Sequence, residues 1–133
     1  MPKGRKGDID MGKKVLVVDD DAMNLKMAEF ILEKQGYEIS KAHSGMECLI
    51  KLQNEPVDLI LLDIEMPIMN GIKTLEIIRD NEQFNAISVM FLTASAEDDV
   101  ITEAGKRLGV LDYINKPFLP QDLLKAVERA CCV

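Results

Sequence analysis

Residues 58–67 read DLILLDIEMP, the stretch around which the rest of the chain is arranged. The apolar run 59–62 is long enough for a buried strand and too short for a helix of its own. It ends abruptly on Asp63. A carboxylate at the end of a buried strand is well placed for chemistry, although Asp63 taken alone would be explained equally well as the start of a solvated loop.

Further strands are predicted from apolar or alternating runs at residues 15–18, 37–42, 87–92 and 111–114. The first of these runs, VLVV, also ends on acids, at Asp19, Asp20 and Asp21. The run 37–42 alternates in the manner of an edge strand. The run ISVMFL ends on Thr93, and the last strand is followed by Asn115, Lys116 and Pro117.

Helical spacing of apolar residues predicts helices at residues 22–35, 44–54, 71–80, 97–108 and from about 120 to the end. In the first helix this spacing assigns the inner face to Met23, Met27, Phe30 and Ile31. In the second helix it marks Met46, Leu49, Ile50 and Leu52. Gly36 is well placed to end the first helix, and Pro120 is favoured in the first turn of the last one.

Strands that alternate with helices predict an α/β fold with a parallel sheet covered by helices on both faces. The nearly continuous apolar runs support this, because strands buried on both faces lose their in-out alternation. A chain of 133 residues suits a single domain. We expect a loose, basic tail over residues 1–12 and one domain over residues 13–133.

Composition excludes several classes of protein. A hydrophobic fraction of 47% with 29% charged residues is typical of a globular protein, and no apolar run approaches the roughly 20 residues of a membrane span. The first residues lack the apolar segment of a secretory signal, so we expect a cytoplasmic location. A net charge of −7 argues against direct binding to nucleic acid.

The cysteines and the only histidine carry little functional information. Cys48 lies among apolar residues at helical spacing and is expected to be buried. Cys131 and Cys132 are adjacent at the end of the chain and do not have zinc-site spacing. His43 has no second histidine or catalytic pattern around it, so we expect a structural or surface role.

Polar side chains follow the ends of several predicted strands. The carboxyl ends of parallel strands lie at one edge of the sheet, which is where ligands of such sheets bind. The residues concerned are Asp19, Asp20, Asp63, Thr93 and Lys116. Each has an ordinary structural explanation by itself, such as a helix cap or a surface cation. Together, close carboxylates call for a hard cation such as magnesium, which keeps room for a substrate phosphate. An aspartate there can attack phosphorus if the charge of the phosphoryl oxygens is balanced.

The segments VLVVDDD, LLDIEMPIMNG, FLTAS and DYINKPF occur in an order that resembles the receiver domain of a two-component response regulator. The resemblance covers about residues 13–132 and implies a flavodoxin-like, doubly wound sheet of five parallel strands in the order 2-1-3-4-5. It also implies that Asp63 is the phosphoacceptor. The bound ion would be magnesium, with manganese as its substitute. Its ligands would be Asp19, Asp20, Asp63 and the backbone carbonyl of Glu65.

Further roles follow from the same resemblance. Thr93 and Lys116 match the hydroxyl and the lysine that contact the phosphoryl group, and Tyr113 matches an aromatic switch residue. Glu65 and Ser95 occupy positions that tune the reaction, and the bond between Lys116 and Pro117 is commonly cis in this family.

The implied function is phosphotransfer signalling rather than enzymatic turnover. A histidine kinase or phosphotransfer protein would donate the phosphoryl group, and self-phosphorylation and autodephosphorylation would be the only reactions of the chain itself. Phosphorylation would alter the surface formed by residues 97–108, residues 111–114 and the last helix. That surface would control a downstream protein or a fused output domain, without direct contact to nucleic acid or membrane.

This chain departs from the usual family pattern at several positions. Asn70 replaces the more frequent Asp before Gly71, which is expected to affect only the turn. Glu65 would repel or position an attacking water, and its effect has no predicted sign. The segment between Thr93 and Lys116 is one residue longer than is common, and Val110 replaces a small Ala, so the start and packing of the helix at 97–108 are open.

The strand-end acids are also compatible with other functions. A phosphohydrolase of the haloacid dehalogenase type also uses a strand-end aspartate, and Asp63-Ile64-Glu65 superficially resembles its motif. Such enzymes require Asp at the second acidic position and usually carry a cap domain. A receiver-like interaction module that is never phosphorylated is a second alternative. A flavodoxin-like nucleotide carrier fits worse, because the loop after residues 15–18 is acidic rather than rich in Gly, Ser and Thr.

Overall fold

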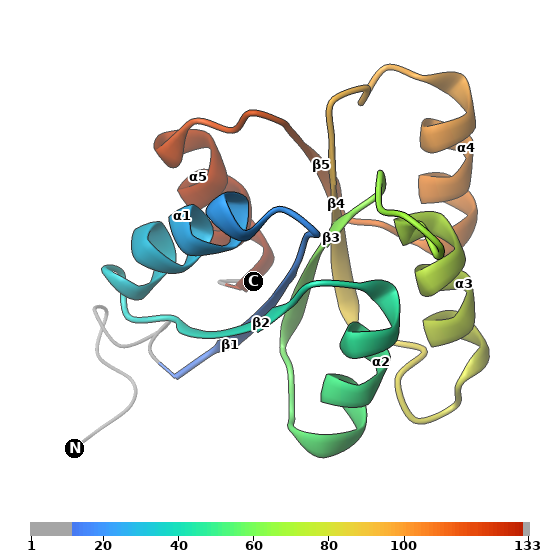
Figure 1. Cartoon of the computed structure of the whole chain (residues 1–133), viewed down its shortest axis with the longest axis horizontal. Helices are drawn as coiled ribbons and strands as arrows, with labels where there is room; N and C mark the ends of the chain where they lie inside the picture. Colours follow the sequence, from blue (N-terminus) through green and yellow to red (C-terminus); the bar gives the residue numbers. More distant parts are fainter. Residues whose placement is uncertain (1–11, 132–133) are drawn as a thin grey trace.

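The computed structural model describes residues 12–131, and within them five parallel strands form one sheet in the order β2-β1-β3-β4-β5 (Figure 1). The strands are β1 (Lys14–Val18), β2 (Glu38–Ala42), β3 (Leu59–Asp63), β4 (Ser88–Thr93) and β5 (Asp112–Asn115). The predicted fold class and strand order are confirmed. Most of the predicted tail at residues 1–12 lies outside the described residues, as does Cys132.

Helices cover both faces of the sheet (Figure 1). Helices α1 (Ala22–Glu33) and α5 (Pro120–Cys131) lie on one face, and α2 (Gly45–Asn54), α3 (Gly71–Asp80) and α4 (Asp99–Leu108) lie on the other. Successive residues of β1 and β3 therefore enter two separate cores. Val17 and Leu61 pack with α1 and α5, whereas Leu16 and Ile60 pack with the helices of the opposite face. This two-sided burial explains the uninterrupted apolar runs.

Side-chain caps set the helix starts. Ser44 caps α2, and Asn70 caps α3 by accepting a hydrogen bond from the Lys73 amide. The predicted start of α4 at residue 97 is two residues too early, because the Asp98 carboxylate accepts hydrogen bonds from the amides of Val100 and Ile101 and so begins the helix at Asp99. Helix α1 ends at Glu33 rather than residue 35, and Gly36 follows with a φ of 94°.

The predicted inner face of α1 is wrong for most of its residues. Met23, Met27 and Phe30 are 65%, 41% and 65% exposed. The residues of α1 that pack on the sheet are Leu25, Ala28, Ile31 and Leu32. Both stripes satisfy helical spacing, so the periodicity alone does not choose between them.

The same error occurs elsewhere on a smaller scale. Met46 and Ile50 of α2 are exposed, whereas Cys48 and Leu52 are buried, which confirms the predictions for Cys48 and Leu52. Strand β5 is shifted by one residue from the prediction, since Leu111 is exposed and precedes it.

Among the helices within residues 12–131, none combines the length and apolar character that a membrane span requires.

Candidate functional site

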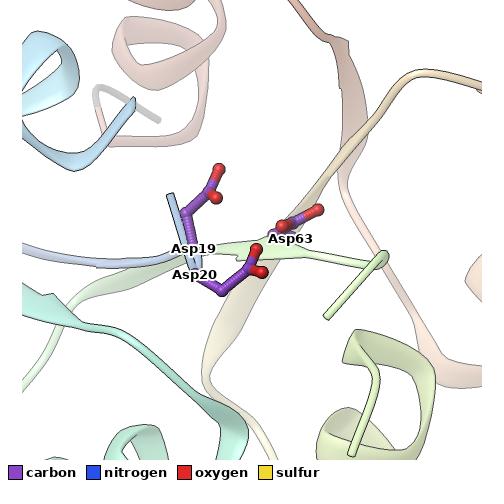
Figure 2. A group of neighbouring side chains, drawn as sticks. All are labelled: Asp19, Asp20 and Asp63. Carbon is purple, nitrogen blue, oxygen red and sulfur yellow. The ribbon is translucent and has the colours of Figure 1, made fainter. Parts of the chain in front are cut away.

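The acidic residues meet at the carboxyl edge of the sheet, where the strand order reverses between β1 and β3. Asp63 is the last residue of β3, and Asp19 and Asp20 follow β1 directly. Figure 2 shows their three carboxylates around a common space. One oxygen from each carboxylate lies within 4.8 Å of the others. The crevice at such a switch point is where ligands bind in open α/β sheets.

The loop after Asp63 is held close to the strand end. The Ile64 amide donates to the Leu92 carbonyl, and the Gly71 amide donates back to the Ile64 carbonyl at 3.0 Å. A Cβ on residue 71 would collide with the backbone carbonyl of Asp63. Glycine at this position therefore lets α3 begin directly beside the acidic site.

The two carboxylate oxygens of Asp63 have different surroundings. Oδ1 accepts hydrogen bonds from Lys116 Nζ at 2.8 Å and from the Glu65 amide at 3.1 Å. Oδ2 is buried and has no hydrogen-bond partner within residues 12–131. Because buried polar atoms are normally satisfied, this orphaned oxygen points to a group that binds there.

The acids after β1 divide between the site and helix α1. Asp19 is buried, and its Oδ1 accepts from the Asp21 amide at 2.9 Å while its Oδ2 accepts from Asn24 Nδ2 at 3.1 Å. Asp20 is exposed at the mouth of the site. Asp21 instead caps α1 by accepting from the Met23 amide. Asn24 was not predicted as a site residue, and its only signal was its place one helical turn after the acids.

Burial and like charge shape the electrostatics of the site. Burial raises the pKa of Asp63 to about 7; the hydrogen bond from Lys116 opposes this rise and the Asp19 carboxylate adds to it. Burial by itself lowers the pKa of Lys116, but the hydrogen bond to Asp63 and the charge of Asp19 outweigh it and leave that pKa above its ordinary value. Lys116 Nζ lies 3.6 Å from Asp19 Oδ2.

The donor set fits a hard divalent cation. Three carboxylates face one space, and among the described residues Lys116 is the one lysine paired with them, so negative charge is in excess there. Oxygen ligands and a small number of carboxylates suit magnesium, which retains waters for its other positions. Asp63 contributes one of these carboxylates from the last position of β3.

Thr93 ends β4 with its side chain buried next to the acids. Its hydroxyl donates to Glu65 Oε2 at 2.8 Å and accepts from the Ser95 amide at 3.0 Å. Its carbonyl accepts from the Lys116 amide, which ties the end of β4 to the end of β5. The Lys116–Pro117 peptide bond is cis.

Tyr113 lies on the far side of β4 from the acids and contacts helix α4. Its ring is half-buried and tilted against Phe91, with ring centroids 6.1 Å apart. Its hydroxyl donates to the Thr102 carbonyl at 3.4 Å. A Cβ on Gly105 would collide with that hydroxyl, so the absence of a side chain at Gly105 makes room for the ring. Sequence reasoning missed Gly105, because a glycine inside a helix does not reveal what packs against it.

The predicted site residues thus fall into three connected groups. Lys116 pairs with both Asp63 and Asp19, and Asp20 completes the acidic group. Glu65, Thr93 and Ser95 form a second group through the Thr93 hydroxyl. Tyr113 contacts α4 instead of the acids.

Comparison with known proteins gives consistent matches. The family model of the response regulator receiver domain matches residues 15–128. The transcriptional regulatory protein CpxR homolog of Haemophilus influenzae is 39% identical over 115 residues, which cover 86% of this chain and 48% of that protein. Protein PilG of Pseudomonas aeruginosa is 33% identical over 118 residues, which cover 88% of this chain and 86% of that protein.

Solved structures agree with these matches. The chemotaxis protein CheY4 of Vibrio cholerae superposes with a TM-score of 0.83 at 33% identity, covering 89% of this chain and 98% of that one. The chain spans about half the length of the first curated relatives that it matches. Because the family match covers most of the chain and the sheet has the CheY-like strand order, the chain belongs to the response regulator receiver domains of two-component signalling.

Proposed function

We propose that this receiver domain accepts a phosphoryl group on Asp63 from a phosphohistidine of a histidine kinase or phosphotransfer protein. The observation that carries the proposal is Asp63 Oδ2, a buried carboxylate oxygen without a hydrogen-bond partner in the described part of the chain. Its partner oxygen is held by Lys116, so Oδ2 is the carboxylate oxygen that has no such hydrogen bond to give up when it attacks phosphorus.

The transfer exchanges one bond to phosphorus for another. Asp63 Oδ2 attacks the phosphorus in line with the P–N bond of the donor and forms a P–O bond. The imidazole nitrogen leaves with the electron pair of the broken P–N bond. Lys116 neutralises part of the negative charge that gathers on the phosphoryl oxygens.

Magnesium, or manganese in its place, would be held by Asp19, Asp20, Asp63 and the backbone carbonyl of Glu65. When bound, the ion supplies positive charge that balances the incoming phosphoryl oxygens. Asn24 and the Asp21 amide position the Asp19 carboxylate from behind, as supporting hydrogen bonds do for metal ligands.

The modified Asp63 would act on the rest of the domain through Thr93 and Lys116. Their hydroxyl and ammonium groups move toward the phosphoryl oxygens, and Tyr113 then shifts inward from its half-buried position. Because Tyr113 contacts α4, this shift reshapes the surface of α4, β5 and α5. The phosphoryl group biases an equilibrium between two conformations rather than creating a new fold.

That surface would control either a separate target protein or an output domain fused to the receiver, in the cytoplasm. Relatives named as transcriptional regulators are about twice as long as this chain, which is compatible with a fused output domain. Protein PilG is close to this chain in length, which is compatible with a stand-alone regulator. In either case the receiver itself makes protein contacts and does not bind nucleic acid or membrane.

Intact-protein mass spectrometry tests the proposal. With magnesium and a small phosphodonor such as phosphoramidate, the chain is expected to gain the mass of one phosphoryl group. Asp63→Asn should abolish the gain, whereas Asp80→Asn, which changes an exposed aspartate of α3, should leave it intact. No gain would favour a phosphorylation-independent interaction module, and steady turnover of a phosphatase substrate would favour a phosphohydrolase.

A further inference from the structure

The carboxylate of Glu65 accepts a hydrogen bond from the Thr93 hydroxyl, a group that the proposed reaction requires. Thr93 Oγ1 donates its hydrogen to Glu65 Oε2 at 2.8 Å. The same oxygen accepts a hydrogen from the Ser95 amide at 3.0 Å. Thr93 is fully buried, whereas Glu65 is exposed at the rim of the site.

A hydroxyl group has one hydrogen to donate, and this makes the two uses of Thr93 mutually exclusive. A phosphoryl oxygen on Asp63 accepts hydrogen bonds and cannot supply a hydrogen in exchange. Thr93 therefore has to release Glu65 before it contacts the phosphoryl group. A hydrogen bond to a charged carboxylate is stronger than one between neutral groups, so this release opposes the reaction measurably.

The position of Glu65 ties this contact to Asp63. Its amide donates to Asp63 Oδ1 at 3.1 Å, so the backbone of Glu65 is fixed beside the phosphoacceptor while its side chain reaches across to Thr93. The exposed side chain has water as an alternative partner and does not need to remain bound. The restraint on Thr93 is therefore reversible, because Glu65 binds water once Thr93 turns toward Asp63.

We propose that Glu65 is a positioning residue that retains the Thr93 hydroxyl in the unphosphorylated protein and thereby restrains phosphorylation and switching. The inference rests on the proposed function of Asp63 and assigns Glu65 a role in that same site. It gives the effect of Glu65 a sign: the residue slows the gain of the phosphoryl group by acting on Thr93. If Glu65 acted instead on the water that hydrolyses the aspartyl phosphate, it would change the rate at which the phosphoryl group is lost.

The rate of phosphorylation by phosphoramidate at saturating magnesium is the first test. The charge of Glu65 strengthens this hydrogen bond, whereas its exposure to water weakens it. Glu65→Ala is therefore expected to raise the rate constant about fivefold, the factor for a hydrogen bond of usual net strength. Glu97→Ala, which removes another exposed acid after β4, is the matched control and should leave the rate unchanged. Equal rates for Glu65→Ala and the unmodified chain would overturn the inference.

A second comparison separates the hydrogen bond from simple charge repulsion. In a Thr93→Val background there is no hydroxyl to retain, so adding Glu65→Ala should no longer raise the rate. In a Thr93→Ser background the hydroxyl is kept and the increase should return. If Glu65→Ala accelerates the reaction equally in the Val background, the charge of Glu65 acts on the phosphodonor directly and the inference is wrong.

A third readout needs neither metal nor phosphodonor. The Ser95 amide donates to Thr93 Oγ1, so its nuclear magnetic resonance signal reports on the hydroxyl. Glu65→Ala should shift that signal in the metal-free protein, and an unchanged signal would exclude the contact. Failure of the proposed function is recognised separately, because the unmodified chain would then gain no phosphoryl group while the Ser95 signal would still respond.

Discussion

At the scale of single residues, Asp63 is buried at a position where a charged carboxylate is poorly solvated. Lys116 compensates part of the charge, but burial and the neighbouring Asp19 leave the pKa of Asp63 raised to about 7. In a folded protein such a group is tolerated when it serves a site rather than the stability of the fold.

This arrangement makes the stability of the metal-free protein depend on pH. The folded state keeps a proton on Asp63 up to a pH of about 7, whereas an unfolded aspartate, with a pKa of 3.8, releases it at a lower pH. The stability contributed by the protonated form is complete below pH about 4 and is lost as the pH rises through about 7. Asp63→Asn stays neutral, so its free energy of unfolding should increasingly exceed that of the unmodified chain across this range.

Urea unfolding in a chelator at several pH values measures this difference. The gap between Asp63→Asn and the unmodified protein should widen from about pH 4 to about pH 7 and stay constant above. Asp122→Asn, at an exposed position in α5, should show no comparable trend. A gap that does not change with pH would mean that Asp63 ionises in its ordinary range.

At the scale of elements, helix α4 combines a capped start with a glycine that accommodates Tyr113. The helix carries its buried residues Ile101, Ala104, Gly105 and Leu108 on one face. Arg79 of α3 holds its far end by donating to the Leu108 carbonyl at 2.7 Å. The proposed output surface is therefore anchored at the end of α4, and near its middle it contacts Tyr113, the proposed switch residue.

The start of α4 is tested by removing its cap. Asp98→Ala should lower the free energy of unfolding by about 1 kcal/mol, because the amides of Val100 and Ile101 lose their acceptor. Glu97→Ala should have almost no effect, since the helix begins after that residue. If the two substitutions had equal effects in urea unfolding, the assigned start at Asp99 would be incorrect.

The packing of Tyr113 is tested at Gly105. Gly105→Ala places a methyl group where the Tyr113 hydroxyl lies, so the ring should move outward and become more accessible. Iodide quenching of tyrosine fluorescence measures this, because the chain has no tryptophan and the other tyrosine, Tyr37, is buried.

The double variant Gly105→Ala/Tyr113→Ala serves as the control for this experiment. Without the ring, the double variant should have a free energy of unfolding about 1 kcal/mol higher than that of Tyr113→Ala alone, since alanine favours a helix over glycine. A similar gain in the presence of Tyr113 would show that the ring does not occupy the space beside Gly105.

At the scale of the whole molecule, the sheet brings together acids from two strand ends that are distant in sequence. Ligand binding to the folded state alone stabilises the fold by mass action. Magnesium at one hundred times its dissociation constant should therefore raise the free energy of unfolding by about 2.7 kcal/mol. Asp19→Asn should reduce this increment, and Asp80→Asn should retain it; no response to magnesium in thermal unfolding would argue against the site.

Much of this architecture was predictable from the chain. Apolar runs ending in Asp19, Asp20 and Asp63 are local features, and a parallel sheet necessarily brings its carboxyl strand ends to one edge. The family motifs supplied the expected strand order, which the structure confirmed. These features follow from the sequence because the length and apolar character of a strand, and the residue that ends it, are local properties of the chain.

Tertiary structure alone decided the features that depend on how distant segments approach one another. Helical spacing allowed two inner faces for α1, and only packing on the sheet selected Leu25, Ala28, Ile31 and Leu32. The contact between Glu65 and Thr93 joins residues 28 positions apart, and the path of the loop after β3 determines it. Sequence patterns report local periodicity, whereas these contacts arise from the relative placement of whole elements.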